Sequence, residues 1–277
     1  MPTRISAALL GLAMMLSACS ASETEPSGAT GRGGAVAAQS AAARALQLPR
    51  MRPVASRTLV ASDRSVVVRV RVQFRGSPSA DTTVQARTFD AACGATFVDT
   101  AVVRNGNFVS DAVVWVEGPT AALITDGRTE RRPTVQLDLC RLRPRVQVAA
   151  PGSTVMLVMR DSMAESLVIV PSAPQLPPDT IPFITYGQLV PVQHRADSLG
   201  MVAVVAARLP WARAFIAIAA PGTGALTDAD GRAQFTLDGR GTTATIKAWH
   251  PSLGTASAKV TLSPMRADYD VTLTFKR

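Results

Sequence analysis

The sequence predicts an all-β protein that consists of two β-sandwiches. After residue 64, short runs in which every second residue is apolar are separated by Gly, Pro, Asn and Asp, which is the pattern of strands and turns. No stretch after residue 56 shows a convincing helical repeat of apolar residues. The length from residue 64 to the end exceeds that of one typical sandwich and therefore favours two.

The clearest strand, SVVVRVRVQFRG, opens this region. Its buried face is predicted to carry Val66, Val68, Val70, Val72 and Phe74. Asn105-Gly106 between two apolar runs predicts a hairpin, and Pro151-Gly152 separates two further strands. Six prolines between positions 171 and 191 indicate a connection that cannot be a central strand. Apolar runs resume at 201–207 and 213–219, and alternating runs continue to the end of the chain.

Residues 1–18 are predicted to form a lipoprotein signal peptide. Their apolar run, from 5 to 16, is too short to span a bilayer. It leads to Leu16-Ser17-Ala18-Cys19, which resembles the lipobox of bacterial lipoproteins; the alternative is an ordinary signal peptide with a chance cysteine. The lipobox implies that Cys19 is acylated and anchors the chain in the cell envelope, with Ser20 indicating the periplasmic side of an outer membrane. Residues 19–63, rich in Ala, Ser and Gly, are expected to form a flexible tether.

The chain is basic, with a net charge of +9 that falls to +8 once Arg4 is removed with the signal peptide. We expect no nucleic-acid partner, because the arginines are dispersed and only 5% of residues are aromatic. The densest arginines are predicted to be solvated strand edges or, alternatively, a patch for an anionic lipid or an acidic envelope protein. They are Arg128, Arg131, Arg132, Arg141, Arg143 and Arg145.

Two cysteines remain after acylation of Cys19, and they are expected to form the disulfide Cys93–Cys140. Export places them in an oxidising compartment, where an even pair favours a bond. A closed loop of about 47 residues would stabilise the fold by about 4 kcal/mol in the chain-entropy treatment. The alternative, thiolate ligation of a metal, needs nearby histidines, and the chain has only His194 and His250.

The C-terminal part, with ALTDADGRAQFTL followed by ATIKAWHPSLG, resembles the carboxypeptidase regulatory-like domain, a small transthyretin-like β-sandwich. The resemblance covers about residues 213–277. Asp228-Ala229-Asp230-Gly231 is interpreted as a tight turn and not as a calcium loop, because an EF-hand loop requires further oxygen ligands and a final glutamate.

Upstream segments resemble exported cupredoxin-like proteins, also called plastocyanin-like or methylamine-utilisation-like. The segments are FDAACG at 89–94, SDAVVWVEG at 110–118, residues 137–162 and LPWARAFIAI at 209–218. The resemblance implies a cupredoxin-like Greek-key β-sandwich at 64–212, followed by the transthyretin-like sandwich at 213–277. Alternatively, VRVRVQFRG and DAVVWVEG supply the opening strands of the second sandwich, and the cupredoxin-like segment is an insertion.

The family binds copper through Asn-x-Asp followed by His-Asn-x-His, and through Cys-x-x-His-Pro-Trp-Met. Alignment on Asp161 puts Glu165 and Val168 at the histidine positions, and alignment on Pro210-Trp211 leaves the second motif without its ligands. The resemblance therefore implies a vestigial metal loop, expected to join the two sandwiches with Trp211 at their junction. Its substituted ligand positions are Ala206, Leu209 and Ala212.

These substitutions favour a non-catalytic binding or assembly module with no cofactor, attached to the membrane by its lipid. Two alternatives remain. Copper could bind or transfer electrons through Met159, Met163 and His194, because thioethers and imidazoles are ligands of copper. An envelope hydrolase would instead use His194 or His250, although no nucleophile or zinc motif accompanies either histidine.

Overall fold

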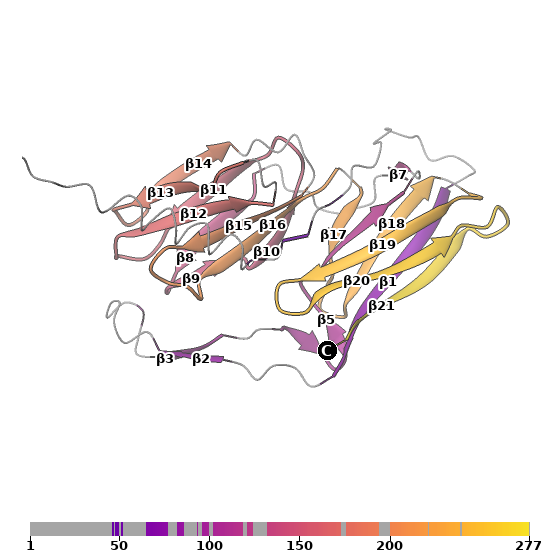
Figure 1. Ribbon diagram of the computed structural model, residues 1–277, viewed down its shortest axis with the longest axis horizontal. Helices are drawn as coiled ribbons and strands as arrows, with labels where there is room; N and C mark the ends of the chain where they lie inside the picture. The colour runs from indigo at the N-terminus through magenta and orange to yellow at the C-terminus, as the bar shows by residue number, and fades with distance from the viewer. Residues whose placement is uncertain are drawn as a thin grey trace, which may run out of the picture.

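All regular elements in the described part of the chain are β-strands, which confirms the predicted all-β class (Figure 1). The computed structural model describes residues 46, 48–49, 51, 65–76, 82–85, 93, 96–99, 102–118, 121–123, 132–172, 176–193, 200–220, 222–238 and 240–276. The signal peptide 1–18, Cys19, Arg128, Arg131 and His194 lie outside them. Within the described ranges, no helix has the length and apolar character needed to cross a membrane.

Strand β1 (Ser65–Arg75) organises the first sandwich, because strands from distant parts of the sequence pair with it on both sides. It pairs antiparallel with β18 (Arg232–Asp238) and parallel with β21 (Asp268–Lys276). The same sheet contains β4 (Arg104–Asn105), β5 (Phe108–Val109) and β7 (Ala121–Leu123). The alternation of β1 buries the predicted face, from Val66 to Phe74.

A four-stranded sheet covers that buried face. Its order is β17 (Gly224–Leu226), β6 (Val113–Glu117), β19 (Thr243–His250) and β20 (Gly254–Thr261). The core between the two sheets includes Val68, Phe74, Phe235, Ile246 and Phe275. We call this unit the split sandwich, because its strands come from both sides of a second unit in the sequence.

The second unit, the inserted sandwich, is formed by residues 134–218. Its four-stranded sheet has the order β14 (Leu189–Gln193), β11 (Thr154–Met159), β8 (Thr134–Asp138) and β9 (Arg141–Arg143). Its five-stranded sheet has the order β10 (Val146–Ala149), β16 (Arg213–Ile218), β15 (Gly200–Ala206), β12 (Glu165–Pro171) and β13 (Asp179–Phe183). A separate pair, β2 (Thr82–Gln85) and β3 (Thr96–Asp99), completes the described strands.

The strand pairing corrects the expected division at residue 213. Strands β1 and β6, expected in the sandwich 64–212, pair with β18, β21, β17 and β19. Strand β16, expected in the sandwich 213–277, pairs with β10 and β15. The alternative arrangement, an insertion between strands of one sandwich, is the one observed. The expected boundary was wrong because alternation determines which face of a strand is buried, but not which other strand pairs with it.

The proline-rich connection contains two strands, β13 and β14, that the sequence left unassigned. Both lie at the edge of a sheet and pair with one strand each, β12 and β11. Pro182 and Pro191 occupy these edge strands, where a missing N–H breaks no central ladder. The expectation that this segment is not a central strand is thus confirmed, although the segment is not merely a connection.

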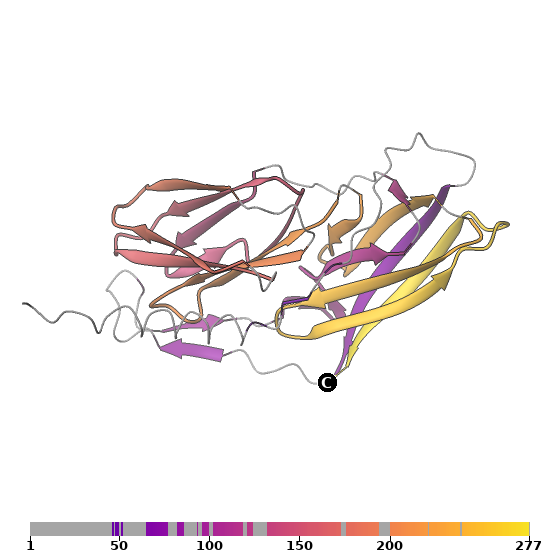
Figure 2. The same cartoon turned by 45° about the horizontal axis from the view of Figure 1, so that its top comes forward.

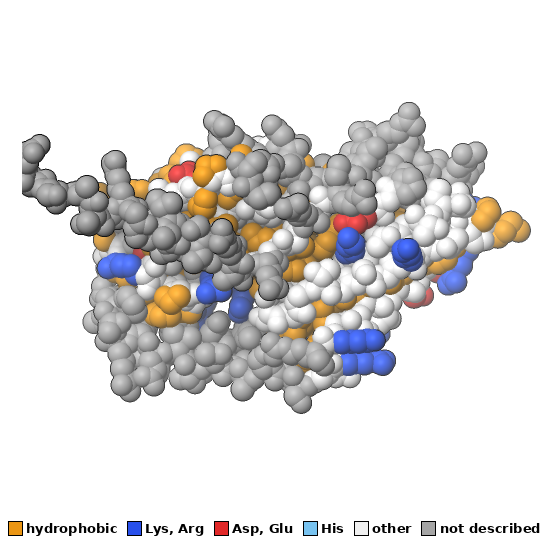
Figure 3. Space-filling model, viewed as in Figure 1, with side chains coloured by type: hydrophobic (Ala, Val, Ile, Leu, Met, Phe, Trp, Pro, Cys, Tyr) orange, Lys and Arg blue, Asp and Glu red, His pale blue; other side chains and the backbone are white. Residues whose placement is uncertain are grey.

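A third apolar cluster joins the two sandwiches, which lie end to end along the long axis (Figure 2). Trp249 of the split sandwich packs edge-on against Phe215 of the inserted sandwich, with ring centroids 5.2 Å apart. Figure 3 shows apolar side chains gathered near the middle of the visible face, between the sandwiches. Leu46 and Met51, from the expected tether 19–63, are buried in this cluster, so the tether is not free at these positions.

The central place of β1 predicts that residues 213–277 do not fold alone. That fragment lacks β1 and β6, which pair with four of its strands, and its apolar faces would have no partner. Far-ultraviolet circular dichroism and urea titration should show no cooperative transition for 213–277, whereas residues 65–277 should unfold cooperatively. A cooperative transition in the short fragment would contradict the assignment of β1.

Candidate functional site

The expected metal loop is a hairpin connection within the inserted sandwich. It joins β15 to β16, which pair antiparallel from Val205–Arg213 to Gly200–Ile218. The N–H of Ala206 donates to the carbonyl oxygen of Ala212 at 3.0 Å, and the N–H of Ala212 donates to that of Leu209 at 2.8 Å. The expectation that this loop joins the two sandwiches, with Trp211 at their junction, is therefore wrong, because β16 belongs to the same sheet as β15.

The substituted ligand positions on this loop are filled by apolar side chains. Ala206, Leu209 and Ala212 are at most 2% exposed and pack in the core of the inserted sandwich, which also contains Met159 and Met163. Methyl and isobutyl groups have no lone pairs, so these three side chains supply no metal ligand.

Val168 lies on the other face of β12 from the loop. It belongs to the apolar cluster between the sandwiches, whereas Leu167 belongs to the core of the inserted sandwich and pairs in register with Ala206. The structure therefore does not bring Val168 together with Ala206, Leu209 and Ala212. Because successive side chains on a strand point to opposite faces, a shift of one residue moves the side chain away from the site.

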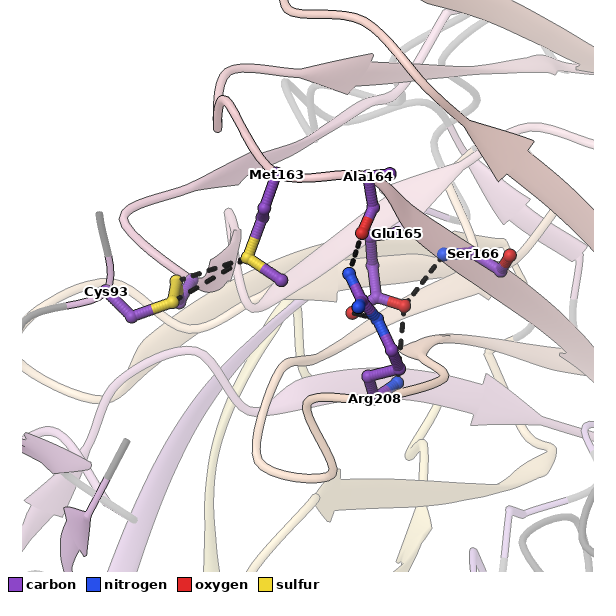
Figure 4. Close-up of polar contacts among 7 residues, drawn as sticks. Cys93, Met163, Ala164, Glu165, Ser166 and Arg208 are labelled. Carbon is purple, nitrogen blue, oxygen red and sulfur yellow. Dashed lines mark hydrogen bonds and ion pairs between the residues drawn. A yellow bond between two sulfur atoms is a disulfide. The ribbon is translucent and has the colours of Figure 1, made fainter. Parts of the chain in front are cut away.

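Glu165 connects the two loops with its carboxylate (Figure 4). Its side chain is fully buried. Oε1 accepts hydrogen bonds from the N–H of Ser166 at 2.7 Å and from the N–H of Arg208 at 3.2 Å. Oε2 lies 3.7 Å from Nε of Arg208, whose guanidinium also donates to the carbonyl oxygen of Ala164. A carboxylate and a guanidinium thus hold together the segments expected to carry copper ligands.

The predicted disulfide Cys93–Cys140 is confirmed, with Cα atoms 5.3 Å apart. Met163 packs on it, with Sδ 3.7 Å from Sγ of Cys93 and 3.9 Å from Sγ of Cys140 (Figure 4). The contact is between a thioether and two disulfide sulfurs, none of which carries a proton. Met163 is therefore held in the core by packing and not by a polar bond.

Cys140 receives two further contacts from the expected site residues. Its N–H donates to Oδ2 of Asp161 at 2.8 Å, and its carbonyl oxygen accepts from Nε1 of Trp211 at 3.0 Å. Leu139 and Cys140 form the two-residue turn between β8 and β9, with φ of 49° and 58°. Residues other than Gly and Asn rarely adopt such positive φ values. The bonds to Asp161 and Trp211, together with the disulfide, hold this turn in place.

The alternative copper ligands are only partly described. Met159 and Met163 are both buried in the core of the inserted sandwich, whereas Met156 points to the other face of β11 and His194 lies outside the described residues. Over the described ranges, no group of three or more His, Cys, Asp or Glu side chains could hold a metal ion.

His250 lies at the end of β19 in the split sandwich and is only 3% exposed. Its Nδ1 accepts a hydrogen bond from the N–H of Ser252 at 3.2 Å. Burial, and secondarily the positive charge of Arg145, lower the pKa of His250 to about 4. The imidazole is therefore neutral at pH 7. Burial also raises the pKa of Asp111, which the charge of Arg145 partly opposes.

No protein-family model matches the chain, and no curated protein sequence matches it. Among solved structures, the chain is similar to a copper-containing nitrite reductase from Thermus scotoductus SA-01, with 18% identity and a TM-score of 0.28 over 32% of this chain. The match spans 23% of that reductase, about a quarter of its length.

Two smaller proteins match this chain with similar sequence identities and TM-scores. A mutant of amicyanin in the Cu(I) form has 12% identity and a TM-score of 0.28, over 38% of this chain and 98% of that one. A purple cupredoxin from Nitrosopumilus maritimus has 15% identity and a TM-score of 0.26, over 31% of this chain and 99% of that one. The all-β architecture of this chain is established by its own strand pairing. Copper is named for those similar proteins and not for this chain.

The buried carboxylate predicts that Glu165→Ala destabilises the inserted sandwich. The substitution leaves the N–H groups of Ser166 and Arg208 without their acceptor, and we expect a loss of about 2–4 kcal/mol in the free energy of unfolding. Urea titration measures the loss. Asp179→Ala removes an exposed carboxylate from the neighbouring strand β13 and should change stability by less than about 0.5 kcal/mol. Equal effects of the two substitutions would contradict the role assigned to Glu165.

The lowered pKa of His250 predicts a loss of stability in acid. The unfolded chain binds this proton near pH 6.5 and the folded chain only near pH 4, so the free energy of unfolding falls as the pH falls between these values. We expect His250 to account for about 2 kcal/mol between pH 7 and about pH 4.5. Urea titrations at both pH values should show a smaller pH dependence for His250→Gln than for the parent chain. An unchanged pH dependence would show that His250 is protonated equally in both states.

Proposed function

We propose that this chain is a non-catalytic binding or assembly module of the cell envelope, with a cupredoxin-like sandwich that holds no metal. The observation that carries this proposal is the Glu165–Arg208 contact, which joins the two loops that would otherwise be joined through a metal ion. The arginine brings a positive charge within 3.7 Å of the buried carboxylate, which offsets part of the cost of burying that negative charge.

Packing around the pair supports the same proposal. A type 1 copper site requires two imidazoles, a thiolate and a weak axial thioether. At the corresponding positions on the β15–β16 loop the chain has Ala206, Leu209 and Ala212, all buried in a continuous apolar core. The disulfide and the bond from Trp211 to Cys140 fasten the surrounding turns without a metal.

The proposed location is the outer membrane, on its periplasmic side, with Cys19 acylated. The disulfide supports an oxidising compartment, because such bonds persist mainly in exported proteins. The lipid would be the membrane partner. An acidic envelope protein or anionic lipid is the proposed second partner for exposed arginines such as Arg132, which precedes β8, and Arg143, the last residue of β9. We propose no role in nucleic-acid binding.

The metal-free proposal predicts the outcome of a copper titration of the purified protein. We expect no intense blue charge-transfer band with Cu(II) and no tight stoichiometric binding, because the loop positions offer no thiolate or imidazole. Absorption spectroscopy and equilibrium dialysis measure these properties. A blue band or tight stoichiometric copper would overturn the metal-free proposal.

Competition with a Cu(I) chelator tests the alternative ligands Met159, Met163 and His194. Met163→Ala is compared with the parent chain and with Met156→Ala, which removes a methionine on the other face of β11. We expect micromolar or weaker affinity that neither substitution changes. Tight binding that is lost in Met163→Ala but retained in Met156→Ala would favour copper handling instead.

A further inference from the structure

A groove of about 690 Å³ lies on the split sandwich, far in the sequence from the loops of the proposed metal-free site. It crosses the three neighbouring strands β18, β1 and β21, which Figure 1 shows side by side. The outward-facing side chains along it are polar, and all of them are exposed. They are Arg69, Arg71, Arg232, Gln234, Asp270 and Thr272, with the exposed Asp228 of the turn before β18 beside them.

Two guanidinium groups lie directly opposite each other in this groove. Arg71 of β1 is in register with Arg232 of β18, a like-charged cross-strand pair that destabilises a sheet unless an anion lies near it. Arg71 stacks on the ring of Phe108, 4.7 Å from its centroid. Arg232 is 3.2 Å from a carboxylate oxygen of Asp230 in the adjacent turn. These contacts orient both groups. Among the described residues, the carboxylates beside Arg232 are Asp230, in an exposed and therefore weak ion pair, and Asp228, whose Oδ1 accepts from the N–H of Arg232 at 2.8 Å.

The third arginine of the groove already has two acidic neighbours, both on β21. Arg69 is 3.1 Å from Asp268 and in register with Asp270 of β21. Across from Arg71, in contrast, β21 presents the neutral side chain of Thr272. Arg71 is therefore the guanidinium of the groove that has an aromatic contact and no carboxylate contact among the described residues. Carboxylates lie near it on both sides, at Asp228 in the turn before β18 and at Asp270 on β21.

We propose that this groove binds a sugar that carries one oxyanion group, a phosphate or a carboxylate. Arg71 and Arg232 bind the oxyanion, because guanidinium groups form paired hydrogen bonds with both. Asp270, Gln234 and Thr272 bind hydroxyl groups, since a purely anionic ligand would be repelled by Asp270. Leu226 of β17 supplies an apolar wall for the C–H face of the ring. The volume lies in the range of small-molecule sites.

Isothermal titration of the protein with four probes tests the proposal. The probes are glucose 6-phosphate, glucuronate, inorganic phosphate and glucose. We expect one or both of the charged sugars to bind, and glucose and inorganic phosphate to bind more weakly, because each has only one of the two features. Stronger binding of glucose 6-phosphate identifies phosphate as the oxyanion, and stronger binding of glucuronate identifies a carboxylate.

Substitutions locate the binding site. Arg71→Gln combined with Arg232→Gln should weaken binding of the charged sugar about tenfold or more, as expected for charge-assisted hydrogen bonds. Arg75→Gln removes the same charge from the same face of β1, outside the groove, and should change the affinity by less than about twofold. Arg71→Lys retains the charge but loses the planar fork, and should also weaken binding if the double variant does not fold.

Three results would overturn the proposal: no binding of either charged sugar at about 10 mM, inorganic phosphate binding as tightly as both, or equal losses in Arg75→Gln and the groove variants. None of them bears on the copper titration, because the groove and the Glu165–Arg208 contact lie on different sandwiches.

Discussion

The pairing of β1 on both of its sides is the constraint on which the architecture depends. One strand near the start of the described fold must find β18 and β21, from the last quarter of the chain, before the split sandwich can close. The residues between β1 and β18, including the inserted sandwich, are therefore connected at both ends to paired strands of the split sandwich. Such long-range pairing makes loop closure entropically costly, and folds dominated by it form slowly. The strong alternation of β1, with a fully apolar inner face, offsets that cost by burial.

Within the inserted sandwich, several contacts hold together the segments that were expected to carry metal ligands. The ion pair of Glu165 with Arg208 joins β12 to the β15–β16 loop. The disulfide and the bond from Trp211 fasten the β8–β9 turn. Leu209 fills the core between them. Without these contacts the region would contain either a cavity or an unpaired buried polar group, and both destabilise a protein.

The sequence was sufficient for features that depend on local pattern or composition. The buried face of β1, the turn at 228–231 and the disulfide between Cys93 and Cys140 are observed as predicted. Partner choice was not predictable, because alternation in β1 and β6 is equally compatible with either sandwich. The partnership of Glu165 with Arg208 was also missed. The sequence did contain a signal for this contact, because Glu165 and Arg208 carry opposite charges and belong to two segments that the resemblance already placed together.

The disulfide has a topological consequence, because Cys93 lies between β1 and β4 of the split sandwich and Cys140 lies in the inserted one. The covalent ring that it closes contains β6 from one unit and β8 from the other. Cys93 itself packs in the core of the inserted sandwich, so the bond fastens a segment that follows β1 to that unit. The inserted sandwich is thus attached by a third covalent connection beside its two peptide junctions, and cleavage of both junctions would leave the two units joined until the disulfide is reduced.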